Sequence, residues 1–346
     1  MPVISKKKPS YKIQPPLHHY LHRYGRAVNL PVTYDDLRHY AHAFPLMDRK
    51  GQDTLWETVT YDPQVMRETY DNLKMTYSLL KTDGDTEMLE HLYIERVDYC
   101  TFGNSNPFRV RIVNQFNDNY DHFYVKRADA SRIYGLELEH ILSPNRINYL
   151  VKGDTLIEEH IAGVPGDDFI KDYLKRPALN QVRLAKEFVK FNERCFVRLL
   201  GDMRSYNYVV DITPDFEEEQ YRVRPIDFDQ QSYDGRRSMY LPQYFKDNNP
   251  IVELCLARLN MKTIRQYQYE ERTLIFRRLK AARYRLKELI DAMRKDRIST
   301  PEHLAQLRRE LNRHYGTDQF DKCRNMGDLV RLHLKVSLKK IHPNQF

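Results

Sequence analysis

Cysteine, glycine and tryptophan are scarce in this chain of 346 residues, which has 4 cysteines, 12 glycines and 1 tryptophan. The cysteines are too widely spaced for a zinc or disulfide framework, so we expect Cys100, Cys195, Cys255 and Cys323 to be buried or idle thiols. Low glycine excludes collagen-like and low-complexity classes, and 41% hydrophobic residues can supply a core. The composition therefore predicts a folded protein of one or two closely packed domains.

Long apolar runs are also missing. No stretch reaches the roughly 18 apolar residues that a membrane-spanning helix needs. The chain begins with a basic cluster, Lys6–Lys8, that has no apolar stretch behind it, so we see no signal peptide. We therefore expect a cytoplasmic protein without a membrane span.

Negative charge is in deficit, since 56 Lys and Arg residues exceed 48 Asp and Glu residues and give a formal net charge of +8. Much of this surplus follows residue 260. An anionic partner such as nucleic acid would suit a basic surface, but acidic residues are interleaved with the basic ones there, which favours ordinary solvated charge. The pattern does not specify an oligomeric state.

Residues 1–30 carry prolines and many basic and aromatic residues without a clear period. This pattern predicts an arm that is extended on the fold or disordered. His18, His19 and His22 invite the hypothesis of a metal site, but neighbouring histidines alone do not complete a coordination shell. We therefore do not expect a metal there.

From Tyr34 to Leu80 a helical period dominates, and Asp62 followed by Pro63 is typical of a helix start. Asp83 and Gly84 end this pattern. Residues 1–90 are thus predicted to form an N-terminal arm and an accessory helical region.

Residues 91–161 change to a period of two, which is typical of half-buried strands. In the run from Phe108 to Ile112, apolar residues alternate with arginines. Helical stripes resume in residues 162–346. The predicted elements of the small lobe are strands at 92–99, 108–112 and 122–126, a helix at 130–142, and strands at 147–151 and 155–160. The fold class is therefore α+β, with a small antiparallel-sheet lobe at 91–161 and a larger helical lobe at 162–346.

The residues best suited to catalysis or metal binding lie between 198 and 230. Asp202 and Asn207 precede a predicted strand, and Asp227 follows the partner strand of the same hairpin. Because a β-hairpin brings its two ends together, we expect Asn207 and Asp227 side by side and Asp202 nearby. Carboxylate and amide oxygens suit a hard cation, and a further carboxylate is left to accept a proton.

This pattern resembles the protein-kinase-like superfamily, especially its atypical and small-molecule branch of aminoglycoside, choline and HipA-like kinases. That family has an Asp, four further residues and an Asn, and later an Asp that opens an Asp-Phe-Gly or Ile-Asp-Phe-Asp motif. Here these are Asp202, Asn207 and the run from Ile226 to Asp229. The resemblance implies a bilobal fold with a nucleotide cleft between its lobes. It also implies that Asp202 is the catalytic base and that Asn207 and Asp227 bind Mg2+.

Upstream residues extend the resemblance. The run from Phe123 to Lys126 looks like the lysine motif on the third strand, so Lys126 would neutralise the α and β phosphates of ATP. Tyr124 shares its strand face and would stack on adenine. A helix glutamate should orient the lysine, and we favour Glu137, although Glu139 is nearly as good a candidate.

The strand near residue 159 resembles the hinge between kinase lobes. The hairpin tip near residue 103 stands in the place of the phosphate-covering loop, with one glycine where the family usually has three. The ATP-binding residues that the resemblance implies in these two segments are Glu159, Ile161, Gly103, Asn104 and Ser105.

These observations predict an ATP-dependent phosphotransferase that moves the γ-phosphoryl of Mg-ATP to a hydroxyl of an unidentified acceptor, which is a small molecule, a saccharide or a protein. Leu200 and Gly201 replace the His-Arg or His-Gly that precedes the catalytic Asp in many relatives, so no subfamily is assigned. The alternative is a catalytically weak pseudokinase that senses nucleotide and binds an acidic protein or nucleic acid. A third hypothesis is an ATP-using enzyme that transfers another group. The basic residues of the pseudokinase hypothesis are Arg272, Arg277, Arg278, Lys280, Arg283, Arg285 and Lys287.

Overall fold

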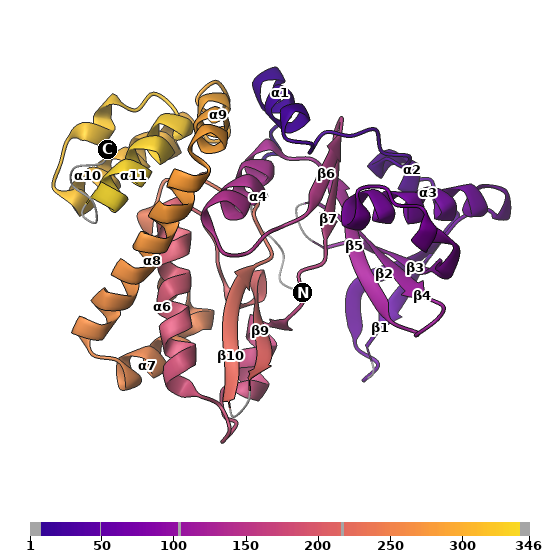
Figure 1. The fold of residues 1–346 in the computed structure, drawn as a ribbon, viewed down its shortest axis with the longest axis horizontal. Helices are drawn as coiled ribbons and strands as arrows, with labels where there is room; N and C mark the ends of the chain where they lie inside the picture. Colours follow the sequence, from indigo (N-terminus) through magenta and orange to yellow (C-terminus); the bar gives the residue numbers. More distant parts are fainter. Residues whose placement is uncertain (1–7, 49, 103–104, 216–217, 340–346) are drawn as a thin grey trace. The chain divides into compact units, whose positions relative to one another are not determined.

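The structure, a computed structural model, describes residues 8–48, 50–102, 105–215 and 218–339. The chain divides into two compact units, which are described one at a time. The first unit comprises Met1–Asp129 and Ile147–His160, and the second comprises Ala130–Arg146 and Ile161–Phe346. The predicted α+β class is confirmed, because the first unit is built on an antiparallel sheet and the second mainly on helices (Figure 1).

The sheet of the first unit has seven strands in the order β1-β2-β3-β4-β5-β7-β6, and all neighbours are antiparallel. The five strands from β3 to β7 are those that the period of two predicts. The strands are β1 (His42–Met47), β2 (Asp53–Thr60), β3 (Leu92–Cys100), β4 (Phe108–Asn114), β5 (Tyr120–Arg127), β6 (Tyr149–Lys152) and β7 (Thr155–Glu159).

One face of this sheet packs against α3 (Pro63–Thr82). Leu73 and Leu80 of the helix are buried in one hydrophobic cluster with Val110 and Phe123 of the sheet. The helix ends where Asp83 adopts a left-handed conformation with φ of 53°. The alternation along β4 and β5 places their polar residues on the opposite face of the sheet.

The prediction of a continuous helical pattern from Tyr34 to Leu80 is wrong for residues 42–60, which form β1 and β2. β2 pairs with β3, placing Val59 opposite Val97 and Trp56 opposite Cys100. β1 gives no alternating signal, because nearly all its side chains are exposed. The N-terminal region therefore belongs to the same sheet as the residues after 91.

The predicted arm contains two helices. α1 (Pro15–Arg23) buries Leu17, Tyr20 and Leu21, and its prolines stand in the first turn, where no intrahelical N–H bond is lost. α2 (Tyr34–Leu37) begins with a capping box between Thr33 and Asp36. Lys6 and Lys7 of the basic cluster lie outside the described residues.

The second unit contains α4 (Ala130–Leu142), which falls inside the predicted small lobe at 91–161. Side-chain bonds connect α4 to distant parts of its own unit: Tyr134 Oη donates to Asp296 Oδ2 at 3.1 Å, and Ser131 Oγ donates to the carbonyl of Gln231 at 2.9 Å. The boundary therefore differs from the predicted one, since these contacts group α4 with the helices that follow it.

The remaining elements of the second unit are mostly helices around a small sheet of order β10-β9-β8. Figure 1 shows the hairpin of β9 and β10 beside α6. These elements are β8 (Val164–Pro165), α5 (Gly166–Asp168), α6 (Gln181–Arg198), β9 (Tyr208–Asp215), β10 (Glu218–Pro225), α7 (Asn249–Arg258), α8 (Met261–Ala281), α9 (Arg283–Met293), α10 (Pro301–Tyr315) and α11 (Met326–Lys339).

Two expectations from composition can be compared with the structure. All four cysteines are unpaired and buried, as predicted. Among the helices of the described ranges, none combines the length and the apolar character needed to cross a membrane.

Leu73→Ala tests whether α3 is part of the core of the first unit. Leu73 is 0% exposed, so we expect the free energy of unfolding to fall by about 2–5 kcal/mol, measured by denaturant titration. Met66→Ala on the same helix is the control, because Met66 is 39% exposed. Equal small effects of both substitutions would contradict the packing described above.

Candidate functional site

The segment between α6 and β9 brings together the predicted residues of the second unit. Asn207 Nδ2 donates to the carbonyl of Asp202 at 2.7 Å, and the N–H of Ile226 donates to the carbonyl of Asn207 at 3.0 Å. β9 and β10 keep their register up to Tyr208 opposite Pro225. The hairpin thus places the start of the Asp227 segment against Asn207, and Asn207 against Asp202, as the sequence predicts.

Asp202 lies in an environment that disfavours its charge. Burial is the largest cause and raises the pKa of the carboxyl to about 6, with a further increase from the neighbouring charge of Asp227. Arg204 opposes the shift, because its Nε lies 3.1 Å from Asp202 Oδ1. The carboxylate can therefore exchange a proton close to neutral pH.

Arg132 of α4 is a site residue that the sequence does not reveal. Its Nη1 lies 2.8 Å from Asp227 Oδ1 and 3.0 Å from Asp229 Oδ1, and its side chain is only 3% exposed. The backbone N–H of Asp229 also donates to Asp227 Oδ1 at 3.0 Å. These bonds fix the orientation of the Asp227 carboxylate, and only the packing of α4 brings the guanidinium to it.

Asn207 and Asp227 fit the donor set that Mg2+ prefers. The amide of Asn207 uses its nitrogen for Asp202, and within the described chain its Oδ1 accepts no hydrogen bond. No cluster of three or more His, Cys, Asp or Glu side chains suited to a metal occurs among the described residues. A site with one carboxylate and one amide is in keeping with Mg2+, which usually binds few protein groups and completes its shell with water and phosphate oxygens.

Lys126 of β5 lies on the polar face of the first unit's sheet. Its Nζ is 2.7 Å from Glu158 Oε2 of β7, and both side chains are at most 10% exposed. The ammonium also lies 5.2 Å from the centre of the Tyr124 ring, whose hydroxyl is 3.2 Å from His160 Nδ1. A strand glutamate that the sequence analysis did not single out therefore accompanies the predicted lysine.

The two helix glutamates have partners within the second unit. Arg285 of α9 makes a bidentate contact with Glu137, with Nη2 2.8 Å from Oε2. Glu139 is ion-paired with Arg198 of α6 and accepts from Asn145 Nδ2 at 3.2 Å. The pairing of Lys126 with Glu137 or Glu139 stays a prediction.

The expected hinge residues belong to different units. The N–H of Glu159 donates to the carbonyl of Asn148 at 3.1 Å, and Glu159 Oε1 accepts from the N–H of Asn148 at 2.8 Å. Ile161 is buried in the second unit. Their contact with adenine stays a prediction.

At the predicted phosphate-covering tip, Gly103 and Asn104 lie outside the described residues, and Ser105 is half-buried.

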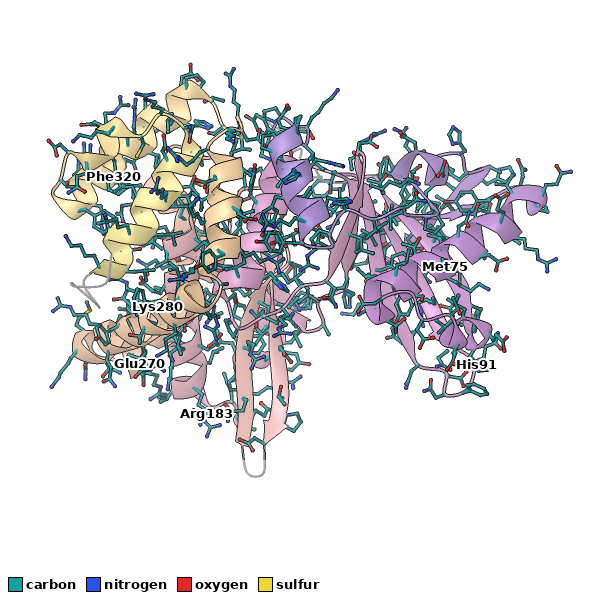
Figure 2. The ribbon with its side chains drawn as sticks, turned by 45° about the horizontal axis from the view of Figure 1, so that its top comes forward. Met75, His91, Arg183, Glu270, Lys280 and Phe320 are labelled. Carbon is teal, nitrogen blue, oxygen red and sulfur yellow. The ribbon has the colours of Figure 1, made fainter. Side chains whose placement is uncertain are left out.

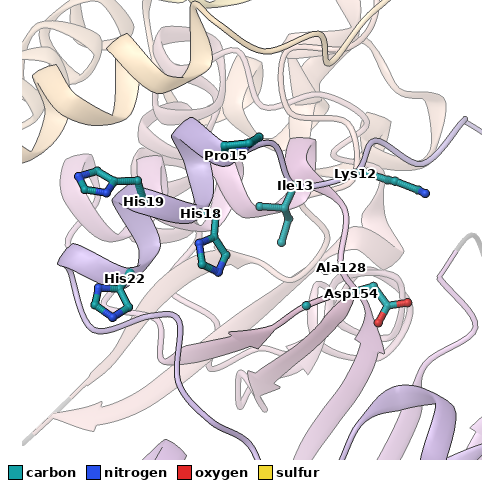
Figure 3. Close-up of a pocket in the computed structure, with 9 residues that line it drawn as sticks. Lys12, Ile13, Pro15, His18, His19, His22, Ala128 and Asp154 are labelled. Carbon is teal, nitrogen blue, oxygen red and sulfur yellow. The ribbon is translucent and has the colours of Figure 1, made fainter.

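The histidines of α1 line a cavity of about 730 Å³ in the first unit. Figure 3 shows His18 and His22 along one side of the cavity and His19 directed away from them. Lys12 and Asp154 also line this space. Imidazole, ammonium and carboxylate groups therefore line this cavity, and the absence of a metal there stays a prediction.

The basic residues of the pseudokinase hypothesis divide into two sets. Arg272 and Arg285 turn inward to Glu193 and Glu137, and Arg278 is half-buried. α8 carries two adjacent acidic residues, Glu270 and Glu271, among a larger number of Lys and Arg residues, and Figure 2 labels Glu270 and Lys280 on this helix. The exposed residues of the set are Arg277, Lys280, Arg283 and Lys287.

No family model and no curated protein sequence matches this chain. Among solved structures, the autoinhibited serine kinase domain of the giant muscle protein titin aligns with 71% of this chain and 93% of its own, at 12% identity and a TM-score of 0.28. Titin kinase with its flanking domains aligns with 72% of this chain and 55% of its own, at 12% identity and a TM-score of 0.26. Likenesses at this level carry no conclusion about function, which therefore rests on the residues themselves.

Asp202→Asn tests the environment of the candidate base without requiring activity. Because the folded-state pKa of Asp202 is raised above its unfolded value, ionisation of Asp202 lowers stability as the pH rises from about 4 to 7. Asn tolerates the left-handed backbone there, where φ is 59°. The difference in the free energy of unfolding between the variant and the unmodified protein should therefore shift by about 2–3 kcal/mol in favour of the variant from pH 4 to pH 8. Denaturant unfolding at each pH measures this difference.

Asp215→Asn is the control, since it removes a carboxylate from the exposed end of β9. Parallel stability curves for the unmodified protein and Asp202→Asn would show that Asp202 is not in a desolvated environment.

Proposed function

We propose that the protein is an ATP-dependent phosphotransferase that moves the γ-phosphoryl of Mg-ATP to a hydroxyl of an acceptor. The observation that carries the proposal is the environment of Asp202. A carboxylate with a pKa raised to about 6 is tied through Asn207 to the segment that bears Asp227. A general base works best when its pKa lies near the operating pH, and strongly shifted pKa values cluster at functional sites.

In this proposal Asp202 accepts the hydroxyl proton of the acceptor and aligns its oxygen with the γ-phosphorus. Asn207 Oδ1 and the Asp227 carboxylate would hold Mg2+, which supplies positive charge to the phosphate oxygens during transfer. Arg132 orients Asp227 through the 2.8 Å contact. The arginine is therefore a positioning residue.

Lys126 would bind the α and β phosphates, and Tyr124 would stack on the adenine ring. The strand partner Glu158 lies 2.7 Å from the ammonium nitrogen and fixes its direction. Glu137, or else Glu139, would complete the charge arrangement, while backbone groups of Glu159 and Ile161 would contact the base.

We assign the chain by its motifs to the atypical and small-molecule branch of protein-kinase-like enzymes. The support is the spacing of Asp202 and Asn207 together with Ile226-Asp227-Phe228-Asp229, in which Asp229 also binds Arg132 at 3.0 Å. The acceptor is accordingly a small alcohol, a saccharide or a protein hydroxyl.

Asp227→Asn and Asp202→Asn test the proposal in a phosphoryl-transfer assay. The unmodified protein is incubated with Mg2+ and γ-labelled ATP, alone and with a cell extract, and label transfer is measured. We expect each variant to lose at least about 100-fold in rate, because one loses the metal carboxylate and the other the base. Circular dichroism and the melting temperature should show that both variants remain folded.

Equal label transfer by Asp202→Asn and the unmodified protein would contradict the assignment of the base. If no protein transfers label although ATP binds, the chain is a nucleotide-sensing pseudokinase instead. Its binding to an acidic partner would then weaken with salt and with Lys280→Ala and Lys287→Ala.

A further inference from the structure

The polar face of the first unit's sheet carries a straight row of side chains across five strands. The register places Thr58 opposite Asp98, Asp98 opposite Arg109, Arg109 opposite Tyr124, and Tyr124 opposite Glu158. Directly opposite residues on neighbouring antiparallel strands share one face and lie within contact distance. Arg109 therefore stands in the middle of this row.

Arg109 is held rigidly. Its Nε and Nη2 donate to Asp98 Oδ2 at 3.2 and 2.8 Å, and its guanidinium carbon lies 4.4 Å from the centre of the Trp56 ring. Bonding to a carboxylate and stacking on an aromatic face remove most of the rotational freedom of the side chain. The cost of ordering it for a ligand is therefore already met by the fold.

Asp98 bonds to its neighbours in this row, but its single negative charge does not balance the arginines around it. Its side chain is 0% exposed and accepts from Thr58 Oγ1 at 2.9 Å, while Arg96 Nε lies 2.8 Å from its other side. One carboxylate thus faces the two guanidinium groups of Arg96 and Arg109. A net positive charge remains at this position.

Part of Arg109 is directed away from Asp98. Within the portion of the chain that the structure describes, its Nη1 has no hydrogen-bond acceptor, and its side chain is 22% exposed. A guanidinium edge with N–H donors and net charge is suited to phosphate oxygens. The arginine is thus both fixed and available.

Neighbouring groups extend the same surface. Burial raises the pKa of the Cys100 thiol, and the positive charges of Arg109 and Lys126 both oppose that shift, so the two cations act on one region. Burial, followed by the charge of Arg109, lowers the pKa of His122 to about 4, so this imidazole is neutral at pH 7. The Trp56 and Tyr124 rings lie 6.5 Å apart. Two cations and two aromatic rings therefore share this face.

We propose that Arg109, held by Asp98 and Trp56, binds a phosphate group of the nucleotide on this face of the sheet. The identity of the ligand as a nucleotide rests on the proposed function. The recognition itself rests on the fixed guanidinium, the surplus charge and the aromatic neighbours. Lysine is not an equivalent replacement for Arg109, because its single nitrogen cannot reproduce a planar guanidinium that bonds to Asp98 through Nε and Nη2 and directs Nη1 elsewhere.

The chain contains a single tryptophan, Trp56, so fluorescence excited selectively at tryptophan reports on this face. ATP, inorganic tripolyphosphate and adenosine are titrated into the full-length protein, with calorimetry as a second measurement. We expect Arg109→Gln and Arg109→Lys to weaken binding of ATP and tripolyphosphate on the order of tenfold or more, with adenosine binding unchanged. Arg109→Gln leaves the buried Asp98 with one cation fewer and could unfold the protein. Arg109→Lys keeps a positive charge beside Asp98, so it tests the same contact in a variant that is expected to fold.

Arg127→Gln is the matched control. Arg127 lies on β5 of the same sheet but on the opposite face, where it pairs with Asp35 and Asp154. Unchanged ATP affinity in both folded Arg109 variants would overturn this inference and leave phosphoryl transfer standing. Tripolyphosphate binding through Arg109 without any ATP binding would support the phosphate site and overturn the proposed function.

Discussion

A carboxylate that is buried away from water requires a cation close by, and this requirement governs how both units are built. Asp98 is buried between two arginines of the sheet, and Glu137 and Glu139 are each met by an arginine from another helix. The two glutamate pairs join segments that are distant along the chain, while the Asp98–Arg109 pair joins the neighbouring strands β3 and β4. Removing one partner would leave a buried charge uncompensated, so these pairs fix which strands and helices are neighbours.

In the candidate site of the second unit, such contacts set the pKa of a carboxyl group. Asn207 connects the Asp202 loop to the end of β10 through one side-chain bond and one backbone bond. The same closure brings Asp227 near enough to raise the pKa of Asp202, while Arg204 and Arg132 each hold one of the two carboxylates. Burial and like charge therefore outweigh the attraction of Arg204, and the pKa of the Asp202 carboxyl is raised to about 6.

The sequence analysis succeeded where one period dominates and failed where it is weak. The helix α4 has its predicted limits, and β3, β4 and β5 follow the alternation of apolar residues that is visible around Phe108–Ile112. β1 exposes nearly all of its side chains and so leaves no pattern to recognise. The prolines of α1 suggest an extended chain, yet Pro15 and Pro16 stand in the first helical turn, where proline is tolerated.

By itself, the sequence determined the α+β class and the meeting of Asp202, Asn207 and Asp227, because a hairpin brings its two ends together whatever surrounds it. Only the tertiary structure decided that Arg132 binds Asp227 and that Arg109 lies between Asp98 and Trp56. The physical reason is that a chain with 56 cations offers every carboxylate many partners. Strand register and helix packing select the one that is buried beside it.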